Sequence, residues 1–445
     1  MDTPIYDFVK DYAARRGVRL HMPGHKGRPL LGCEEWDITE VAGADALYEA
    51  EGIIARSEQN AAALFGSGAT FYSTEGSSHC IKAMLHLALQ CRRREAAPVI
   101  VAARNVHRSF VHAAALLGFT PLWLQPEGGS GSVCSCPVTP EGLELALEEM
   151  TVVPAAVYLT SPDYLGGMAD IAALAEVCHR HGTLLLVDNA HGAYLHFLPR
   201  PIHPLDLGAD LTCDSAHKTL PVLTGGAYLH IGKNAPGEMA KRAKSALALF
   251  GSTSPSYLTL SSLDLCNACL AGDYAPRLSK TAAELDGVRA RLRWAGWTVE
   301  QSDPLRLTLT APAGRTGTEL SQILRDGGVE CEYADEKHLV AMVTPENTPE
   351  ELWRLPALLG ENRVPARETE LLPPLRAERV LSVREALFAP AERVAREEAL
   401  GRVCAGPTVA CPPAIPIVVA GERIDRSALE LLARYGVAWV DVVIE

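Results

Sequence analysis

One lysine in this chain lies where a strand is expected to end and a tight turn to begin. The stretch 209–228, ADLTCDSAHKTLPVLTGGAY, runs an apolar segment into DSAHKT and then into two glycines. A partly buried lysine beside serine and histidine loses hydration, so its pKa falls and its neutral amine becomes a nucleophile toward an aldehyde. Lys218 is therefore a candidate for Schiff-base chemistry, although an arbitrary lysine is more often exposed on a loop.

An acid ends a second apolar run, TLLLVDNAH at 183–191. Such runs are typical of buried parallel strands, and an acid at the carboxyl end of one faces the crevice where α/β proteins bind ligands. In enzymes that use pyridoxal 5'-phosphate (PLP), a carboxylate keeps the ring nitrogen protonated so that the ring can take up electrons. Asp188 and Lys218 together predict PLP as the cofactor. Without Lys218, a helix N-cap would be the better interpretation of Asp188.

A third stretch offers a place for the cofactor phosphate. Residues 69–74, ATFYST, predict a strand that leads to Gly76, Ser77 and Ser78, and a helical pattern follows. Backbone N–H groups and hydroxyls at the start of a helix attract anions. We expect these three residues to bind phosphate. N-capping by one of the serines is the simpler alternative and is compatible with that role.

Apolar strands and helical patterns alternate regularly from residue 98 to residue 190. This rhythm predicts an α/β fold whose mostly parallel sheet is covered by helices on both faces. His107, Asp188 and Lys218 each follow a predicted strand end. All three are therefore expected at the carboxyl edge of the sheet.

These motifs together resemble the Orn/Lys/Arg decarboxylase family of fold-type-I PLP enzymes. The resemblance rests on SAHK at Lys218, VDNAHGA at Asp188, RNVHRS at His107, STEGSSHCIKA at Gly76 and the N-terminal HMPGHKG, and it extends to ACPPAIPIVVAGERI near the C-terminus. It implies the aminotransferase-like fold and a short form without an N-terminal wing domain. It also implies decarboxylation of arginine, lysine or ornithine to an amine and CO2, in polyamine metabolism.

The resemblance further implies roles for individual side chains. His107 would stack on the cofactor ring, Ser215 would bind the phosphate, and His217 would contact the phosphate or the substrate. His191 also matches the family pattern as a cofactor-binding residue. Lys218 or His217 would return a proton to the substrate Cα.

In the family a Ser/Thr-rich stretch, here with Ser252 and Thr253, reaches the phosphate of the neighbouring subunit. A homodimer with active sites at the subunit interface is therefore expected. An ordinary polar turn is an equal alternative interpretation of this stretch.

Within one chain we expect an N-terminal arm (1–55), a large PLP-binding domain (56–295), a small α+β domain (296–362), and a linker with a C-terminal decarboxylase-type domain (363–445).

Composition narrows the class of protein. The 445 residues are 48% hydrophobic and 21% charged, as in ordinary globular proteins, and the formal net charge is −13. This charge argues against nucleic acid and anionic membranes as partners and favours cationic substrates. No leader-like or membrane-length apolar run is present, so a cytoplasmic protein is expected. The twelve cysteines are scattered and no His/Cys set has zinc spacing, so no metal is expected.

Some alternatives stay open at this point. An aminotransferase or an eliminating lyase would use the same cofactor residues, since fold does not fix reaction, and a PLP-binding regulatory homologue is the non-enzyme alternative. The chain also departs from the family pattern at Gly225–Gly226, at Cys411–Ala414 and at Arg108. The first two departures lie near the expected substrate pocket, so the choice of amino acid is open.

Overall fold

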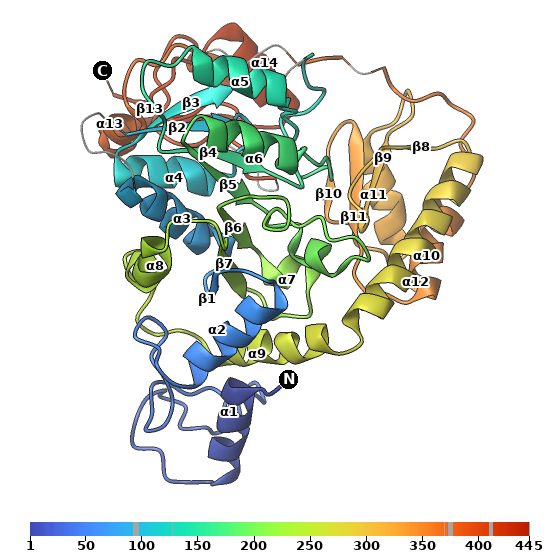
Figure 1. The fold of residues 1–445 in the computed structure, drawn as a ribbon. Coiled ribbons are helices and arrows are strands. Elements are labelled where there is room, and N and C mark those ends of the chain that lie inside the picture. Colours follow the sequence, from blue (N-terminus) through green and yellow to red (C-terminus); the bar gives the residue numbers. More distant parts are fainter. Residues whose placement is uncertain (92–97, 127, 369, 373–376, 409–412, 445) are drawn as a thin grey trace. The chain divides into compact units, whose positions relative to one another are not determined.

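A computed structural model gives the fold and describes residues 1–91, 98–126, 128–368, 370–372, 377–408 and 413–444 (Figure 1). The chain divides into two compact units, each built from separate segments. The first unit comprises Met1–Arg92 and Leu184–Leu278, and the second comprises Arg93–Thr183 and Ser279–Glu445.

The first unit contains four strands in the order β1-β7-β6-β5. Strands β5 and β6 are parallel, whereas β7 runs antiparallel to both β6 and β1. Three of the four strands therefore point the same way. The strands are β1 Ala69–Ser73, β5 Leu184–Asp188, β6 Leu211–Asp214 and β7 Ala227–Ile231.

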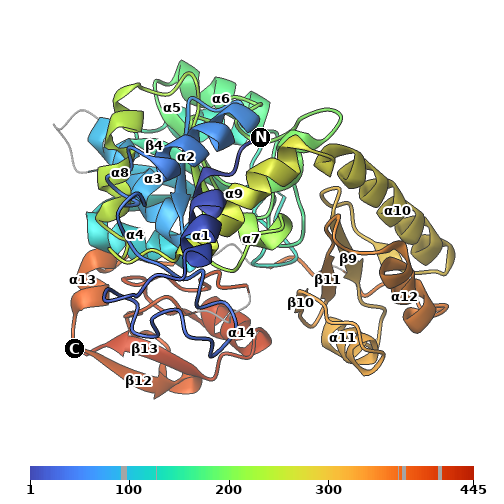
Figure 2. The same cartoon turned by 90° about the horizontal axis from the view of Figure 1, so that it is seen from below.

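Helices of the first unit cover this sheet. Helix α3 packs against β6, β7 and the neighbouring α8, which Figure 2 shows beside it. Cys80, Met84 and Leu87 of α3 are fully buried, as expected for the apolar stripe of an amphipathic helix. The helices are α1 Pro4–Ala14, α2 Ile53–Leu64, α3 Ser77–Cys91, η1 Ala193–Phe197, α7 Ala216–Thr219, α8 Glu238–Ala248 and α9 Tyr257–Ala271.

The second unit begins with three parallel strands in the order β4-β2-β3 and the helices that alternate with them. A threonine caps one of these helices, since Thr139 Oγ1 accepts a hydrogen bond from Gly142 N at 3.1 Å. The elements are β2 Val99–Ala103, α4 Arg108–Leu117, β3 Thr120–Leu124, α5 Pro140–Glu148, β4 Ala156–Thr160 and α6 Ile171–Arg180.

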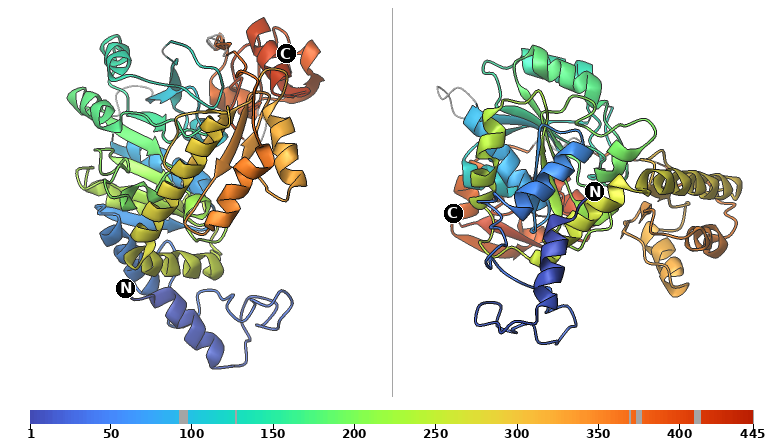
Figure 3. Two further views of the ribbon diagram at one scale, coloured as in Figure 1. Left: turned by 90° about the vertical axis from the view of Figure 1, so that its right-hand side faces the viewer. Right: turned by 60° about the horizontal axis from the view of Figure 1, so that its bottom comes forward.

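An antiparallel sheet in the order β10-β11-β9-β8 follows in the second unit. Leu285, Leu320 and Leu352 of three helices, coloured yellow to orange in Figure 3, share one hydrophobic core with this sheet. The elements are α10 Tyr274–Trp294, β8 Thr298–Val299, β9 Arg306–Thr310, α11 Gly317–Asp326, β10 Tyr333–Ala334, β11 His338–Met342 and α12 Pro349–Leu359.

The chain ends with a two-stranded antiparallel sheet, β12–β13, beside α14 (Figure 2). Leu432 of α14 and Val440 and Val442 of β13 belong to one buried cluster. The elements are α13 Val383–Phe388, β12 Ala391–Ala395, η2 Arg396–Glu398, α14 Arg426–Arg434 and β13 Trp439–Val443.

The predicted α/β class with mostly parallel strands is confirmed. The boundaries of the four expected domains stay predictions. Among the residues that the structure describes, no helix is both long and apolar enough to cross a membrane.

Candidate active site

The carboxyl ends of two neighbouring strands bring the predicted catalytic residues of the first unit together. In the parallel pair β5–β6, the Cα of Asp188 is the register partner of the Cα of Cys213. Helix α7, which carries Lys218, begins three residues after Cys213. Asp188 and Lys218 therefore both lie at the carboxyl edge of this sheet, as the sequence predicted.

Lys218 makes a specific contact at this edge. Its Nζ lies 2.9 Å from His191 Nε2. The lysine is half-buried and His191 is almost wholly buried. The sequence assigned His191 a role only through its match to the family pattern. In the structure, His191 is the hydrogen-bond partner of the candidate nucleophile.

Asp188 is 3% exposed and is the last residue of β5. Its Oδ1 accepts hydrogen bonds from Ala190 N at 3.2 Å and from Cys213 Sγ at 3.6 Å. The short helix that follows, η1, has Gly192 at its N-cap position. The helix-capping interpretation of Asp188 is therefore wrong.

The expected phosphate residues meet at the first turn of α3. Ser77 is the first residue of that helix, and Ser215 Oγ donates to Ser77 Oγ at 2.7 Å. Gly76, with φ of 73°, adopts the left-handed conformation that glycine tolerates, and its N–H donates to Gly225 O at 2.7 Å. Two hydroxyls and a helix N-terminus in one place are suited to an anion.

His217 lies beside the same turn. Its Nδ1 is 3.0 Å from Gly226 O, and because a carbonyl can only accept, Nδ1 carries the proton. Burial and the nearby charge of Lys218 lower the pKa of His217, despite the opposing effect of the carbonyl. His217 is therefore a neutral imidazole near pH 7, with its second nitrogen available as an acceptor.

The unusual Gly225–Gly226 pair has a structural reason. Gly225 has φ of 97°, and a Cβ there would lie 2.5 Å from the Thr74 backbone oxygen. The carbonyls of the pair accept hydrogen bonds from Gly76 and His217. This departure from the family pattern thus lies against the turn at Gly76, which is expected to bind phosphate.

A buried polar network supports the strand ends. Asp214 Oδ2 is 2.9 Å from His203 Nε2 and 3.4 Å from His230 Nε2, while Asp214 Oδ1 accepts from Asn189 Nδ2 at 2.8 Å. The side chains of Asp214 and both histidines are fully buried. Burial alone would raise the pKa of Asp214, but the two histidines outweigh it and hold that pKa well below its usual range.

Sequence reasoning missed this network. Asp214 directly precedes Ser215, and Asn189 directly follows Asp188, so the network ties together the backbone on which two site residues lie. The adjacency of Asp214 to the SAHK motif was the one available signal. Its partners His203 and His230 lie in separate segments that only the fold brings near.

The remaining predicted residues lie elsewhere. His107 is in the second unit, where its Nδ1 caps α4 by accepting from Ser109 N at 3.2 Å, so its place relative to Lys218 stays a prediction. Ser252 and Thr253 are exposed, and Ser252 N donates to Glu75 Oε1 at 2.6 Å, next to Gly76. Their role toward a neighbouring subunit is likewise untested.

Two departures from the family pattern meet in the second unit. Arg108 N donates to Ala414 O at 2.9 Å. Within the Cys411–Ala414 segment, residues 411 and 412 lie outside the described residues.

Comparison with known proteins agrees with the resemblance. The family model for the Orn/Lys/Arg decarboxylase major domain matches residues 3–300. The uncharacterized protein YaaO of Bacillus subtilis is 31% identical, with 98% of this chain and 94% of that protein covered. The arginine decarboxylase of the same organism is 30% identical, with 97% and 93% covered.

Solved structures confirm the fold. The lysine decarboxylase LdcF of Francisella novicida superposes with a TM-score of 0.81 at 17% identity, covering 99% of this chain and 81% of that one. Serine palmitoyltransferase from S. paucimobilis, whose structure contains a PLP adduct, gives 0.56 at 15% identity, with 80% and 83% covered. The family match over two thirds of the sequence, together with these folds, shows that the chain belongs to the Orn/Lys/Arg decarboxylase family.

Proposed function

We propose that this protein is a PLP-dependent decarboxylase of a basic α-amino acid, namely arginine, lysine or ornithine, and that it serves polyamine metabolism. The contact of Lys218 Nζ with His191 at the strand edge that carries Asp188 is the observation on which the proposal rests. Relatives named arginine decarboxylase support the substrate class. The net charge of −13 also favours a cationic substrate.

The residues of the first unit fit PLP. Ser77 and Ser215 offer hydroxyls at the start of α3 for a phosphate, and Asp188 offers a buried carboxylate for a protonated ring nitrogen. Gly76 has φ of 73°, a left-handed conformation that glycine adopts without strain, so glycine suits this turn. When bound, PLP would supply a ring that accepts the electrons left by departing CO2.

The protein's own groups would control the proton that replaces the carboxylate. His217 is fixed by Gly226 O and leaves one nitrogen to accept or relay a proton. Lys218, positioned by His191, is the second candidate to deliver the proton to Cα. Burial of Asp188, His191 and Ser215 keeps water from this part of the site.

Two further elements belong to the proposal. His107 would stack on the cofactor ring and hold it flat, since it follows β2 just as Asp188 ends β5. Ser252 and Thr253 would reach the phosphate of a second subunit, which makes the homodimer the active form. Their exposure in this chain is compatible with such a contact.

Mass spectrometry of the products tests the function. PLP-loaded protein is given arginine, lysine and ornithine separately, and the Lys218→Ala variant serves as the blank. We expect a single amine, agmatine, cadaverine or putrescine, formed only by the unmodified protein. A keto acid without amine would show transamination, and no product from a protein that visibly binds PLP would refute the proposed substrate class.

A further inference from the structure

A cavity in the second unit lies at the carboxyl ends of β2 and β4. It encloses about 570 Å³, part of it open to solvent. Two aspartates line it, and no lysine, arginine or histidine is among its described lining residues. The polar ones are Asn105, Ser135, Thr160, Asp163 and Asp170.

Asp163 is the deepest charge in this cavity, with 5% of its surface exposed. Its Oδ1 accepts hydrogen bonds from Leu165 N at 2.9 Å and Gly167 N at 2.8 Å, and the Ser135 hydroxyl also bonds the carboxylate. Burial raises the pKa of Asp163 to about 6, against the opposing effect of these donors. The carboxylate is thus mostly ionised at pH 7.

A cationic group that acts on Asp163 is engaged elsewhere. Arg306 exerts a weak attraction on Asp163. Its guanidinium pairs with Asp303 at 3.3 Å and donates to Tyr164 O at 2.9 Å. The charge of Asp163 is therefore not matched by a cation that lines the cavity.

Two buried oxygens in the lining lack a hydrogen-bond partner within the described structure. Asn105 is 4% exposed, and its Nδ2 donates to Cys134 O at 3.2 Å, which fixes the amide so that Oδ1 is the acceptor left over. Thr160 Oγ1 is the other unpartnered oxygen. Buried polar atoms are nearly always satisfied, so these two oxygens indicate a missing donor.

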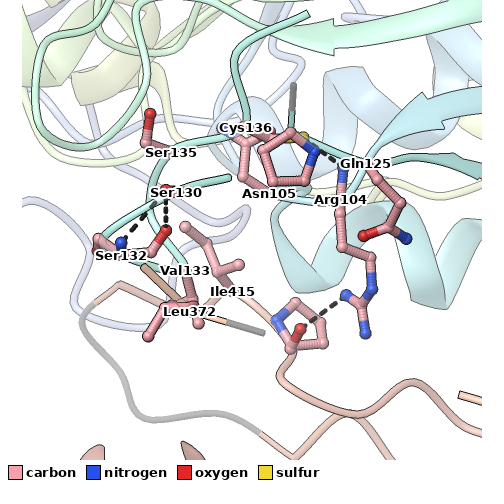
Figure 4. Close-up of a pocket in the computed structure, with 12 residues that line it drawn as sticks. Arg104, Asn105, Gln125, Ser130, Ser132, Val133, Ser135, Cys136, Leu372 and Ile415 are labelled. Carbon is pink, nitrogen blue, oxygen red and sulfur yellow. Dashed lines mark hydrogen bonds between the residues drawn. The ribbon is translucent and has the colours of Figure 1, made fainter. Parts of the chain in front are cut away.

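We propose that this cavity binds an alkyl ammonium or guanidinium cation. Such a group carries several N–H donors and one positive charge, which match the Asp163 carboxylate and the oxygens of Asn105 and Thr160. The neighbouring cavity in Figure 4 shares Asn105, Ser135 and Cys136, but the Arg104 guanidinium on its wall makes it unsuited to a cation.

This inference goes beyond the proposed function, because it concerns binding and holds whether or not the protein decarboxylates. The cation has two possible sources, the side chain of a basic amino acid or a free amine. Both present the same group to the cavity. The experiment below separates them.

Calorimetric titration of the full PLP-loaded chain with agmatine tests the site. Asp163→Asn keeps an oxygen for the backbone amides of Leu165 and Gly167 but removes the charge, and we expect the Kd to rise at least about tenfold. Thr160→Val preserves shape and removes only the unpartnered hydroxyl, and a rise of about threefold is expected. Asp326→Asn removes an exposed carboxylate of the same unit and should change nothing.

The same titrations with arginine, made in the Lys218→Ala background, identify the source. If Asp163→Asn weakens both ligands, the cavity holds the side chain of the amino acid; if it weakens agmatine alone, the cavity is a separate amine site. Unchanged agmatine affinity in folded Asp163→Asn and Thr160→Val would overturn the inference. So would an equal loss in Asp326→Asn, since that would show only long-range attraction.

Discussion

We expect the replacement of Asp214 by asparagine to lower the free energy of unfolding more than the replacement of a partly exposed aspartate does. One oxygen of the carboxylate accepts a hydrogen bond from Asn189, and the other accepts one from His203. The side chains of His203 and of the nearby His230 are fully buried. Because Leu205 N donates to His203 Nδ1, His203 carries its proton on Nε2 and donates to the carboxylate. In Asp214→Asn, an amide NH2 would face one of these donors, which leaves a buried polar group unpaired.

The expected loss is about 1 to 3 kcal/mol of unfolding free energy, as for a buried polar group that loses its hydrogen-bond partner. Urea denaturation at pH 7 measures it. Asp206→Asn is the matched control, because Asp206 pairs with His196 at 2.8 Å in the same unit and both side chains are partly exposed. For this variant we expect a loss of unfolding free energy below about 1 kcal/mol. Equal losses in the two variants would refute the reasoning.

The pH dependence gives a second check of the same carboxylate. A folded-state pKa below the usual value stabilises the protein above the unfolded-state pKa, about 3.9 for aspartate. That stabilisation is lost as the pH falls through the folded-state value. The difference in unfolding free energy between the unsubstituted protein and Asp214→Asn should therefore have its full value at pH 7 and become smaller below about pH 4. A difference that grew on acidification would contradict the assigned charge.

Three further variants probe the site directly. His191→Phe removes the hydrogen-bond partner of Lys218, and steady-state kinetics should show kcat lowered about tenfold. Ser215→Ala removes the hydroxyl that bonds Ser77, so PLP affinity, followed by absorbance, should fall about fivefold. Gly225→Ala places a Cβ 2.5 Å from a backbone oxygen at φ of 97°, and PLP binding should be lost.

Each of these variants has a control. His86→Phe changes a histidine of α3 that bonds Gln90, and unchanged kcat is expected; equal losses in the two histidine variants would contradict the assigned contact. Ser67→Ala removes a hydroxyl bonded to Thr70, and it should retain PLP affinity. A Cβ at Gly17 would meet no atom within 4 Å, so Gly17→Ala should retain PLP binding. Retained PLP binding in Gly225→Ala as well would contradict the tight packing of the turn.

Much of the first unit's site could be predicted from sequence because its residues are adjacent to strand ends. Asp188 and Lys218 each follow an apolar run, and parallel strands place such positions on one edge. Ser77 and Gly76 follow from the rule that a strand-to-helix turn presents N–H groups.

The rest depended on contacts between distant segments. His203 and His230 reach Asp214 from a loop and from an antiparallel strand, and no spacing in the sequence predicts that meeting. Asp163 and Asn105 likewise follow different strands, and only their shared cavity gives them a common role. The sequence places the Gly225–Gly226 pair only near the expected substrate pocket, and the contacts of its two carbonyls with Gly76 and His217 are legible only in the fold.

Borohydride reduction of the PLP-loaded protein, followed by peptide mapping, tests the central claim most directly. The account predicts that the pyridoxyl group is fixed on Lys218 and that the Lys218→Ala variant is not labelled. Lys244, the partly buried lysine paired with Glu58 in the same unit, is an internal control that should remain unmodified. Labelling of Lys244, or of any lysine other than Lys218, would contradict the assignment of this active site.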